Sequence, residues 1–456
     1  MHPSLRGLLP LLLLVGCPPH GETGGPRQVE PWVSEVGWEL HPEFGSIVRV
    51  NWTQEHHCDS RVEYRFDGDA WLSTPTLLRD VGDHAQLLLG VPYDTELQLQ
   101  VVTDAGAVVQ RSAVQAAHTS PAPSPVLQPT LRAADPTRWE STGQWLLGSM
   151  NTTMPGWQTG EFWTFILDRQ GRLVWARQTP ELLFTLQVHQ AADGAGILVD
   201  ETTFWSLWDF DEPSMVHRMT IAGTVVDSYE IADANHPYTE LPDGRLAWWG
   251  MPGEGEGELK ILEADGSVTT VWSCLEFFDT LGIEGSCLGN TVSWRASDDS
   301  FLVSLALQNL VIHIDHATGA TLRVFGQDEQ AWSFDPPESG FWLQHGVAFT
   351  DTGTLLLSTH AGDDDETGVA REYSLDEDAQ VLRQVWSYGE GLGVSAGLGG
   401  EAQRLPGGNT LHNYGTTPRV KEITPDGDVV WDADWEIERL IGHTTWLEDL
   451  YPLLGE

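Results

Sequence analysis

A repeat of roughly 40–50 residues runs from about residue 140 to 432, and a period of that length is typical of β-propeller blades. Each repeat combines two short patterns. The first is a turn built on Pro-Asp-Gly or a similar triplet followed by an apolar stretch, as in residues 241–246. The second is an Asp/Gly turn that leads to a tryptophan, as in Asp265-Gly266 ahead of Trp272. Glycine permits the positive φ of tight hairpins, and the tryptophans are expected to fill the seams between blades.

Counting the paired patterns predicts six blades, and a count of five or seven stays open if a terminal blade is shared. The predicted blades lie at about 143–176, 186–229, 235–272, 290–326, 344–389 and 401–432. We assign residues 140–456 to the propeller. The predicted fold class is all-β, with a small β-sandwich followed by a six-bladed β-propeller.

The predicted sandwich occupies residues 32–118. Alternating segments at 47–52, 62–66 and 97–101, separated by turn signals, predict antiparallel strands. The pattern resembles a fibronectin type III module, a unit that usually acts as a spacer or docking domain, and we assign no chemistry to it. The proline-rich residues 119–139 predict a stiff linker between the two units.

The N-terminus predicts export and a lipid anchor. Arg6 precedes an apolar run, Leu8 to Val15, which is too short to span a bilayer and has the length of a signal-peptide core. The run ends in Leu14-Val15-Gly16-Cys17, which resembles the bacterial lipobox, so we expect residues 1–16 to be removed and Cys17 to carry the lipid. In the alternative, Cys17 is an ordinary cysteine after a plain signal peptide. Residues 17–31 predict a tether that holds the protein at the periplasmic face or the cell surface.

The charge balance excludes two classes of partner. The chain has a formal net charge of −44, and removal of the signal peptide, whose only charged residue is Arg6, makes it one unit more negative. Such a surface repels nucleic acid and anionic lipid, so the only membrane contact we expect is through the lipid on Cys17. Solubility or adaptation to salt is the simpler explanation of the charge. An anionic substrate would need a local positive pocket.

The remaining cysteines and the acidic segments predict no metal site. Cys274 and Cys287 flank one loop and can form a disulfide in an oxidising compartment, which leaves Cys58 buried or free. None of them has the spacing of metal ligands. The acidic loop at residues 360–366 offers oxygen ligands suited to calcium, but on so acidic a protein a solvated hairpin tip is the simpler interpretation.

Histidines recur where the innermost strand of a blade should begin. His236 lies eight residues before Gly244, and His345 lies eight residues before Gly353. His189 is near the equivalent point of the second blade, and Asn290 takes this position in the fourth. Because these strand ends converge on the central channel, the histidines predict a polar site there, although a single histidine at a strand start is more often a local hydrogen-bonding group.

The stretch from Leu288 to Trp431 resembles the bacterial arylsulfotransferase family, and a weaker likeness extends back to about residue 140. The matching segments are 290–292, 298–304, 311–315, 344–345, 372–376, 384–389 and 403–406. The resemblance implies a sandwich before a six-bladed propeller, exported to the periplasm. It also implies transfer of a sulfuryl group from an aryl sulfate to a phenol through a sulfated histidine, with no cofactor.

Site roles are carried over from the family one residue at a time. His345 falls on its Gln-His element, which binds sulfate. The expected His-x-Asn element reads Leu288-Gly289-Asn290, so its histidine is absent. The sulfate-binding arginine falls at Val369 by strict register, and Arg371 lies two residues on, on the same side of a strand. The nucleophilic histidine falls near Arg419, and His412 is the histidine available seven residues earlier. The predicted catalytic residues are His345, His412 and Arg371, and the predicted substrate contacts are His236, His189, Arg419 and Asn290.

Three functions remain open at this point. The first is a sulfotransferase that uses the residues above, with aryl sulfates and phenols as substrates. The second is a lipoprotein that kept the scaffold and binds a ligand or a protein without catalysis. The third is a calcium-dependent propeller hydrolase built on the acidic loop.

Overall fold

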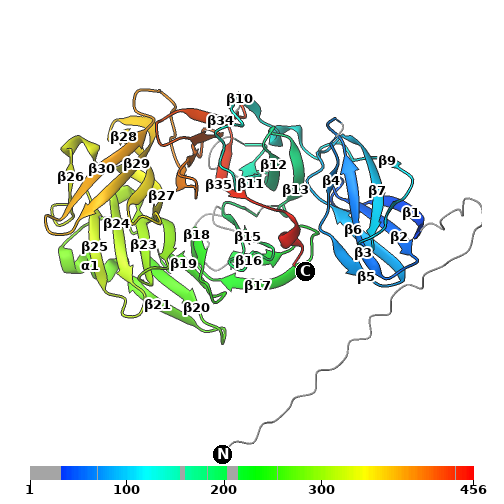
Figure 1. The fold of residues 1–456 in the computed structure, drawn as a ribbon. Coiled ribbons are helices and arrows are strands. Elements are labelled where there is room, and N and C mark those ends of the chain that lie inside the picture. The colour runs from blue at the N-terminus through cyan, green and yellow to red at the C-terminus, as the bar shows by residue number, and fades with distance from the viewer. Residues whose placement is uncertain are drawn as a thin grey trace, which may run out of the picture.

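The computed structural model describes residues 32–68, 70–154, 160–181, 183–202, 214–253, 255–436 and 438–455, and almost all of its elements are β-strands. A small sandwich packs beside a larger ring of sheets (Figure 1). The predicted signal peptide, the lipidated Cys17 and the tether lie outside the described residues. Within the described part of the chain, no helix has the length and apolar character needed to cross a membrane.

Two antiparallel sheets form the sandwich. One contains β1 (Val33–Leu40), β2 (Val48–Gln54) and β6 (Gly82–Leu88). The other contains β3 (Cys58–Arg65), β4 (Leu72–Ser73), β5 (Leu77–Arg79), β7 (Glu96–Asp104), β8 (Val109–Arg111) and β9 (Gln115–His118). Alternate residues of β2 are buried, as expected of strands with one face on a core, and Trp52 and Val101 belong to that core. Cys58 is a buried free thiol.

Six further sheets form the blades of the propeller, and we number them in chain order. Blade 1 contains β35 (Leu440–Leu447), β11 (Trp145–Asn151), β12 (Phe162–Asp168) and β13 (Leu173–Gln178). Blade 2 contains β14 (Val188–Gln190), β15 (Ile197–Glu201), β16 (Ser214–Met219) and β17 (Val225–Ile231). Blade 3 contains β18 (Ala234–Glu240), β19 (Leu246–Gly250), β20 (Glu258–Leu262) and β21 (Val268–Ser273).

Blades 4 to 6 repeat the arrangement. Blade 4 contains β22 (Gly289–Arg295), β23 (Ser300–Leu305), β24 (Leu310–Asp315) and β25 (Thr321–Gly326). Blade 5 contains β27 (Trp342–Phe349), β28 (Leu355–Gly362), β29 (Asp365–Asp376) and β30 (Val381–Tyr388), with β26 (Ser333–Asp335) added outside. Blade 6 contains β31 (Glu401–Arg404), β32 (Thr410–Asn413), β33 (Arg419–Ile423) and β34 (Val429–Asp434), with β10 (Thr130–Ala134) added outside. The predicted all-β fold, a sandwich followed by a six-bladed propeller, is confirmed.

The ring closes through the C-terminal strand. β35 pairs with β11 from Trp145↔Leu447 to Asn151↔Leu440 and supplies the innermost strand of blade 1 (Figure 1). The predicted first blade covered about 143–176 and the last ended at 432, so the repeat pattern assigned β35 to no blade. β10, which lies in the segment predicted as a linker, also pairs with β34 and so belongs to blade 6. Both strands join segments that are distant in sequence.

The sandwich and the propeller share a hydrophobic core. Phe44 of the sandwich packs against Trp175 of blade 1, with ring centroids 5.3 Å apart, and the two residues belong to one buried cluster. The backbone N–H of Tyr93 donates to the carbonyl of Leu173 at 3.0 Å. These contacts indicate a sandwich that is fixed to the propeller.

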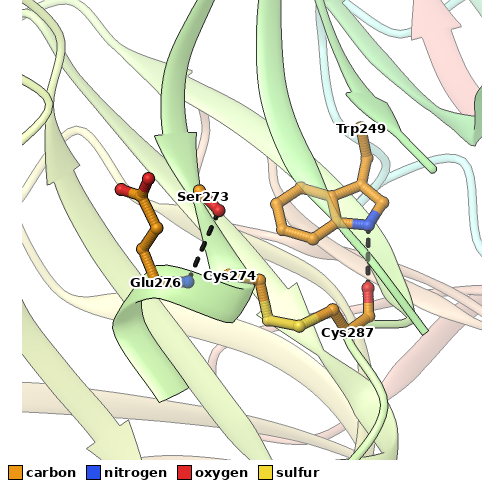
Figure 2. The surroundings of a disulfide bond; sticks show 5 residues. All are labelled: Trp249, Ser273, Cys274, Glu276 and Cys287. Atoms are coloured by element: carbon orange, nitrogen blue, oxygen red, sulfur yellow. Dashed lines mark hydrogen bonds between the residues drawn. A yellow bond between two sulfur atoms is a disulfide. The ribbon is translucent and has the colours of Figure 1, made fainter. Parts of the chain in front are cut away.

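Cys274 and Cys287 are joined by a disulfide beside the one α-helix of the described residues, α1 (Cys274–Leu281) (Figure 2). The Ser273 side chain caps this helix by accepting from the Glu276 backbone N–H. The indole of Trp249 donates to the Cys287 carbonyl at 3.0 Å (Figure 2). The disulfide therefore closes the loop between blades 3 and 4, and the hydrogen bond attaches that loop to the buried Trp249. The remaining short elements are 3-10 turns, η1 (Pro125–Leu127), η2 (Ala306–Gln308), η3 (Pro337–Ser339) and η4 (Tyr451–Leu454).

Candidate functional site

Two neighbouring spaces lie among the innermost strands of the blades, and the larger one extends to the outer strands of blade 5. The larger space is a cavity of about 800 Å³, lined by residues from blades 1 to 6 that include His189, Asn290 and Arg404. The smaller space has a volume of about 20 Å³ and is lined by His236 and His345 among others. Gln187, Glu401 and His443 line both. These three shared residues form the boundary between the two spaces.

His236 and His345 stack on each other beside the smaller space. Their ring centroids are 5.8 Å apart and their planes differ by 13°. Burial, with the neighbouring His345 acting in the same direction, lowers the pKa of His236 to about 3. Burial also lowers the pKa of His345, although Glu401 and a hydrogen bond to the Gly400 backbone act in the opposite sense. Both rings are therefore neutral imidazoles at pH 7.

The hydrogen bonding of His345 leaves one ring nitrogen available. Its Nδ1 is buried and has no hydrogen-bond partner among the described residues. A neutral imidazole protonated at Nε2 has its lone pair on Nδ1, which is the arrangement of a nucleophile or a base.

Glu401 and His443 form a largely buried pair next to this stack. The Nδ1 atom of His443 lies 2.7 Å from a carboxylate oxygen of Glu401, and the His443 ring lies 4.3 Å from the ring of His189, centroid to centroid. Burial would raise the pKa of Glu401, but the charge of His443, their hydrogen bond and the nearby His345 outweigh it, so the pKa is lowered. Glu401 is therefore a carboxylate at neutral pH.

Sequence reasoning missed His443, because the predicted blades ended at residue 432. Glu401 begins the sixth predicted blade, at about 401–432, but nothing in the sequence indicated its partner.

Two predicted substrate contacts line the large cavity. His189 stands on β14, and burial, followed by the proximity of His443, holds its pKa well below the ordinary value. Asn290 lies on β22, and its side-chain amide donates to the Gln344 carbonyl at 2.8 Å. That bond positions Gln344, the residue before His345.

The structure places His412, Arg371 and Arg419 away from both spaces. His412 lies on β32, the second strand of blade 6, where its Nε2 is 3.1 Å from the Ser358 hydroxyl. Arg371 lies on β29, the third strand of blade 5, and donates to the carbonyls of Ala361 and Gly340. Arg419 donates twice to Asp432, at 2.8 and 2.6 Å. None of the three lines either space, although Ser358, the hydrogen-bond partner of His412, is the strand partner of His345.

The charged groups of the large cavity are mostly acidic. Arg404 is the one arginine or lysine among its described lining residues, and it pairs with Glu372 and lies 5.0 Å from the ring of Trp386. Asp351 and Glu401 add two more carboxylates. The cavity therefore presents no cation that lacks an acidic partner. Across the described residues, including the acidic loop, no group of three or more His, Cys, Asp and Glu side chains could hold a metal ion.

The burial of His412 predicts a pH dependence of stability. Its pKa is lowered to about 3, first by burial and then by Lys421, whereas a histidine in an unfolded chain titrates near pH 6.5. Below pH 6.5 the unfolded state therefore binds a proton that the folded state does not, and stability falls with the pH. We expect this residue to cost about 2 kcal/mol at pH 5 relative to pH 8. Urea unfolding of wild type and His412→Gln at both pH values measures the cost, and an equal pH dependence of the two proteins would contradict it.

Comparison with known proteins supports an arylsulfotransferase-like function. The model of the arylsulfotransferase (ASST) family matches residues 283–436, which confirms the resemblance noted in the sequence. The chain is similar to a solved protein of unknown function from Bacteroides caccae, with 17% identity over 67% of this chain and 100% of that chain and a TM-score of 0.45. It is also similar to a putative 6-phosphogluconolactonase from Bacteroides uniformis, with 13% identity over 64% and 82% of the two chains and a TM-score of 0.38. No curated protein matches the chain.

Proposed function

We propose that this protein transfers a sulfuryl group from an aryl sulfate to a phenol, with His345 as the nucleophile that carries the group between two half-reactions. The observation that supports the proposal most directly is the neutral His345 imidazole, whose Nδ1 is buried and unbonded among the described residues, and which lines the small space that shares Gln187, Glu401 and His443 with the large cavity. The family match over blades 4 to 6 includes His345.

The proposed reaction has two displacements at sulfur. In the first, the Nδ1 lone pair of His345 forms a bond to sulfur while the bond from sulfur to the aryl oxygen breaks and a phenolate leaves. In the second, the oxygen of an acceptor phenol forms a bond to the same sulfur, its proton is removed and the nitrogen–sulfur bond breaks. The two steps return His345 to its neutral state and exchange one aryl sulfate for another.

The large cavity suits aromatic substrates. Tyr238, Trp294, Phe349 and Trp386 lie among its lining residues, and its volume of about 800 Å³ is within the range of sites that hold small organic ligands. Aromatic rings favour offset or edge contacts with a bound phenyl group. The same walls serve donor and acceptor, as an exchange between two aryl groups requires.

The test of this function is a transfer assay on the purified protein. Incubation with p-nitrophenyl sulfate and a phenol should release p-nitrophenolate, measured by absorbance, together with the sulfated acceptor, measured by mass spectrometry. Release that requires the acceptor distinguishes transfer from hydrolysis. Absence of release across several donors and acceptors would overturn the proposal.

A second candidate is a binding protein without turnover, and the positions of the arginines favour it. Arg371 and Arg419 have partners outside the cavity, and Arg404 is paired with Glu372, so no free cation is placed to hold a sulfate among the described lining residues. Calorimetric titration with phenols separates the candidates, because binding without sulfate transfer would support the second.

We also propose that the protein is exported and anchored through a lipid on Cys17. The lipobox-like sequence and a disulfide, which persists in oxidising compartments, support this location. We expect Cys17→Ser to move the protein from the membrane fraction to the soluble fraction of the cells that express it, measured by immunoblotting. Retention of the variant in the membrane fraction would contradict the anchor.

A further inference from the structure

We propose that His443, held by Glu401, is the proton relay of the transfer reaction, protonating the departing phenolate and deprotonating the incoming phenol. This inference rests on the function proposed above and adds to it a residue from the strand that closes the propeller. Three features of the pair carry the argument: its position, its rigidity and its charge.

His443 occupies the boundary at which a substrate oxygen and His345 would meet. It lines both the large cavity and the smaller space that contains His345. Its side chain is 13% exposed and that of Glu401 is 16% exposed, so the pair is largely buried yet accessible from the cavity. Because the carboxylate of Glu401 holds Nδ1, the nitrogen left for proton exchange is Nε2.

The backbone on both sides of His443 is held in place. Its own N–H donates to the Leu186 carbonyl at 2.7 Å, and the Asn413 side chain donates to the Gly442 carbonyl at 2.6 Å. A side chain at Gly442 would overlap the Leu186 carbonyl, so only glycine permits this close approach. These contacts from blades 2 and 6 hold the backbone from which the His443 side chain projects. A proton relay needs a side chain with such a fixed position.

The position of Glu401 depends on Gly346, the residue that follows the proposed nucleophile His345. Gly346 has a φ of +59°, and a Cβ at that position would lie 2.7 Å from the Cα of Glu401. Glycine at this point lets Glu401 lie directly against β27, between His345 and His443. The carboxylate of Glu401 then lies 2.7 Å from Nδ1 of His443 and orients the ring, as a buried acid orients a catalytic imidazole.

Protons balance over the cycle. In the first half-reaction the imidazolium form of His443 gives its Nε2 proton to the phenolate oxygen as the sulfur–oxygen bond breaks, and a neutral phenol leaves. In the second, neutral His443 takes the proton of the acceptor phenol while the phenol oxygen attacks sulfur and the bond to His345 breaks. His443 ends the cycle as it began, and Glu401 stays ionised throughout.

The test uses two donors whose leaving groups differ in basicity. We expect His443→Gln to lower kcat/KM for phenyl sulfate by about 100- to 1,000-fold and that for p-nitrophenyl sulfate by about tenfold or less. The reason is that p-nitrophenolate is a weak base and leaves without a proton, whereas phenolate does not. In a two-step exchange kcat/KM for the donor reports the first half-reaction alone.

Two further variants control for structure. Glu401→Gln keeps the shape of the side chain and removes its charge, so we expect the same donor dependence with a smaller loss. His217→Gln removes a histidine from a comparable pair, since His217 lies 3.4 Å from Glu201 on blade 2 and lines neither space. It should retain the activity of wild type with both donors.

The outcomes separate the relay from the function on which it rests. Equal losses with both donors in His443→Gln and Glu401→Gln, or no loss with either, would overturn the relay while leaving sulfuryl transfer by His345 intact. Absence of turnover by the wild-type protein would overturn both proposals. A loss that grows with the basicity of the leaving group supports the relay, because a purely structural defect does not depend on the donor.

Discussion

Replacement of His345 by alanine is expected to lower sulfuryl transfer by at least about 10⁴-fold, because the covalent intermediate cannot form without its nucleophile. The variant should still bind phenols, since the aromatic walls of the large cavity do not include His345. The measurements are kcat/KM with p-nitrophenyl sulfate for the loss and calorimetric titration with a phenol for the retained binding.

The matched control is His313→Ala. His313 is fully buried on β24 of blade 4, where its Nε2 is 2.7 Å from the Ser300 hydroxyl, and it lines neither space. Loss of a buried histidine at that position should lower stability with little effect on the rate of transfer. If His345→Ala retained the activity of wild type, the nucleophile would be another residue, and His443 and His189 of the large cavity would be the first to test.

The blades were predictable from sequence because each hairpin turn has a recognisable local sequence pattern. Turns with positive φ need glycine, as at Gly244 and Gly353. Such turns recur with the blade repeat of roughly 40–50 residues. The pairing of β35 and β10 has no such pattern, because no hairpin turn connects them to their partners β11 and β34, which lie about 300 residues away in the chain. Pairing at that distance follows from closure of the ring rather than from any local pattern.

The site was predictable only where blade register placed a residue on the channel. His236 and His345 occupy the same point of the inner strands of blades 3 and 5, and the structure stacks their rings. Arg371 was selected because alternate residues share one side of a strand, which says nothing about the distance of that strand from the axis. β29 is the third strand of its blade, and Arg371 there holds loop carbonyls instead of facing the channel. His412 was selected as the histidine available near Arg419, and that choice likewise says nothing about the distance from the axis of β32, the second strand of its blade.

A buried ion pair at the closure of the ring carries the largest predicted effect on stability. Arg169, which follows β12 of blade 1, pairs with Glu422 on β33 of blade 6, and their side chains are 5% and 0% exposed. Glu422 also accepts from the Glu140 backbone N–H at 2.5 Å and from the Asn409 amide at 2.7 Å. The guanidinium of Arg169 lies 3.7 Å from the ring of Trp446 on the closing strand. The pair therefore links both ends of the propeller.

Glu422→Leu is expected to lower the free energy of unfolding by about 3–5 kcal/mol, because it leaves the Arg169 charge buried without its partner. Arg169→Met should cost a similar amount for the converse reason. The double variant, Arg169→Met with Glu422→Leu, should recover most of the loss, since apolar side chains of similar volume need no charge partner. Urea unfolding of the four proteins measures the coupling. Additive losses in the double variant would show that the individual hydrogen bonds, and not the burial of an unpaired charge, determine the stability of the closure.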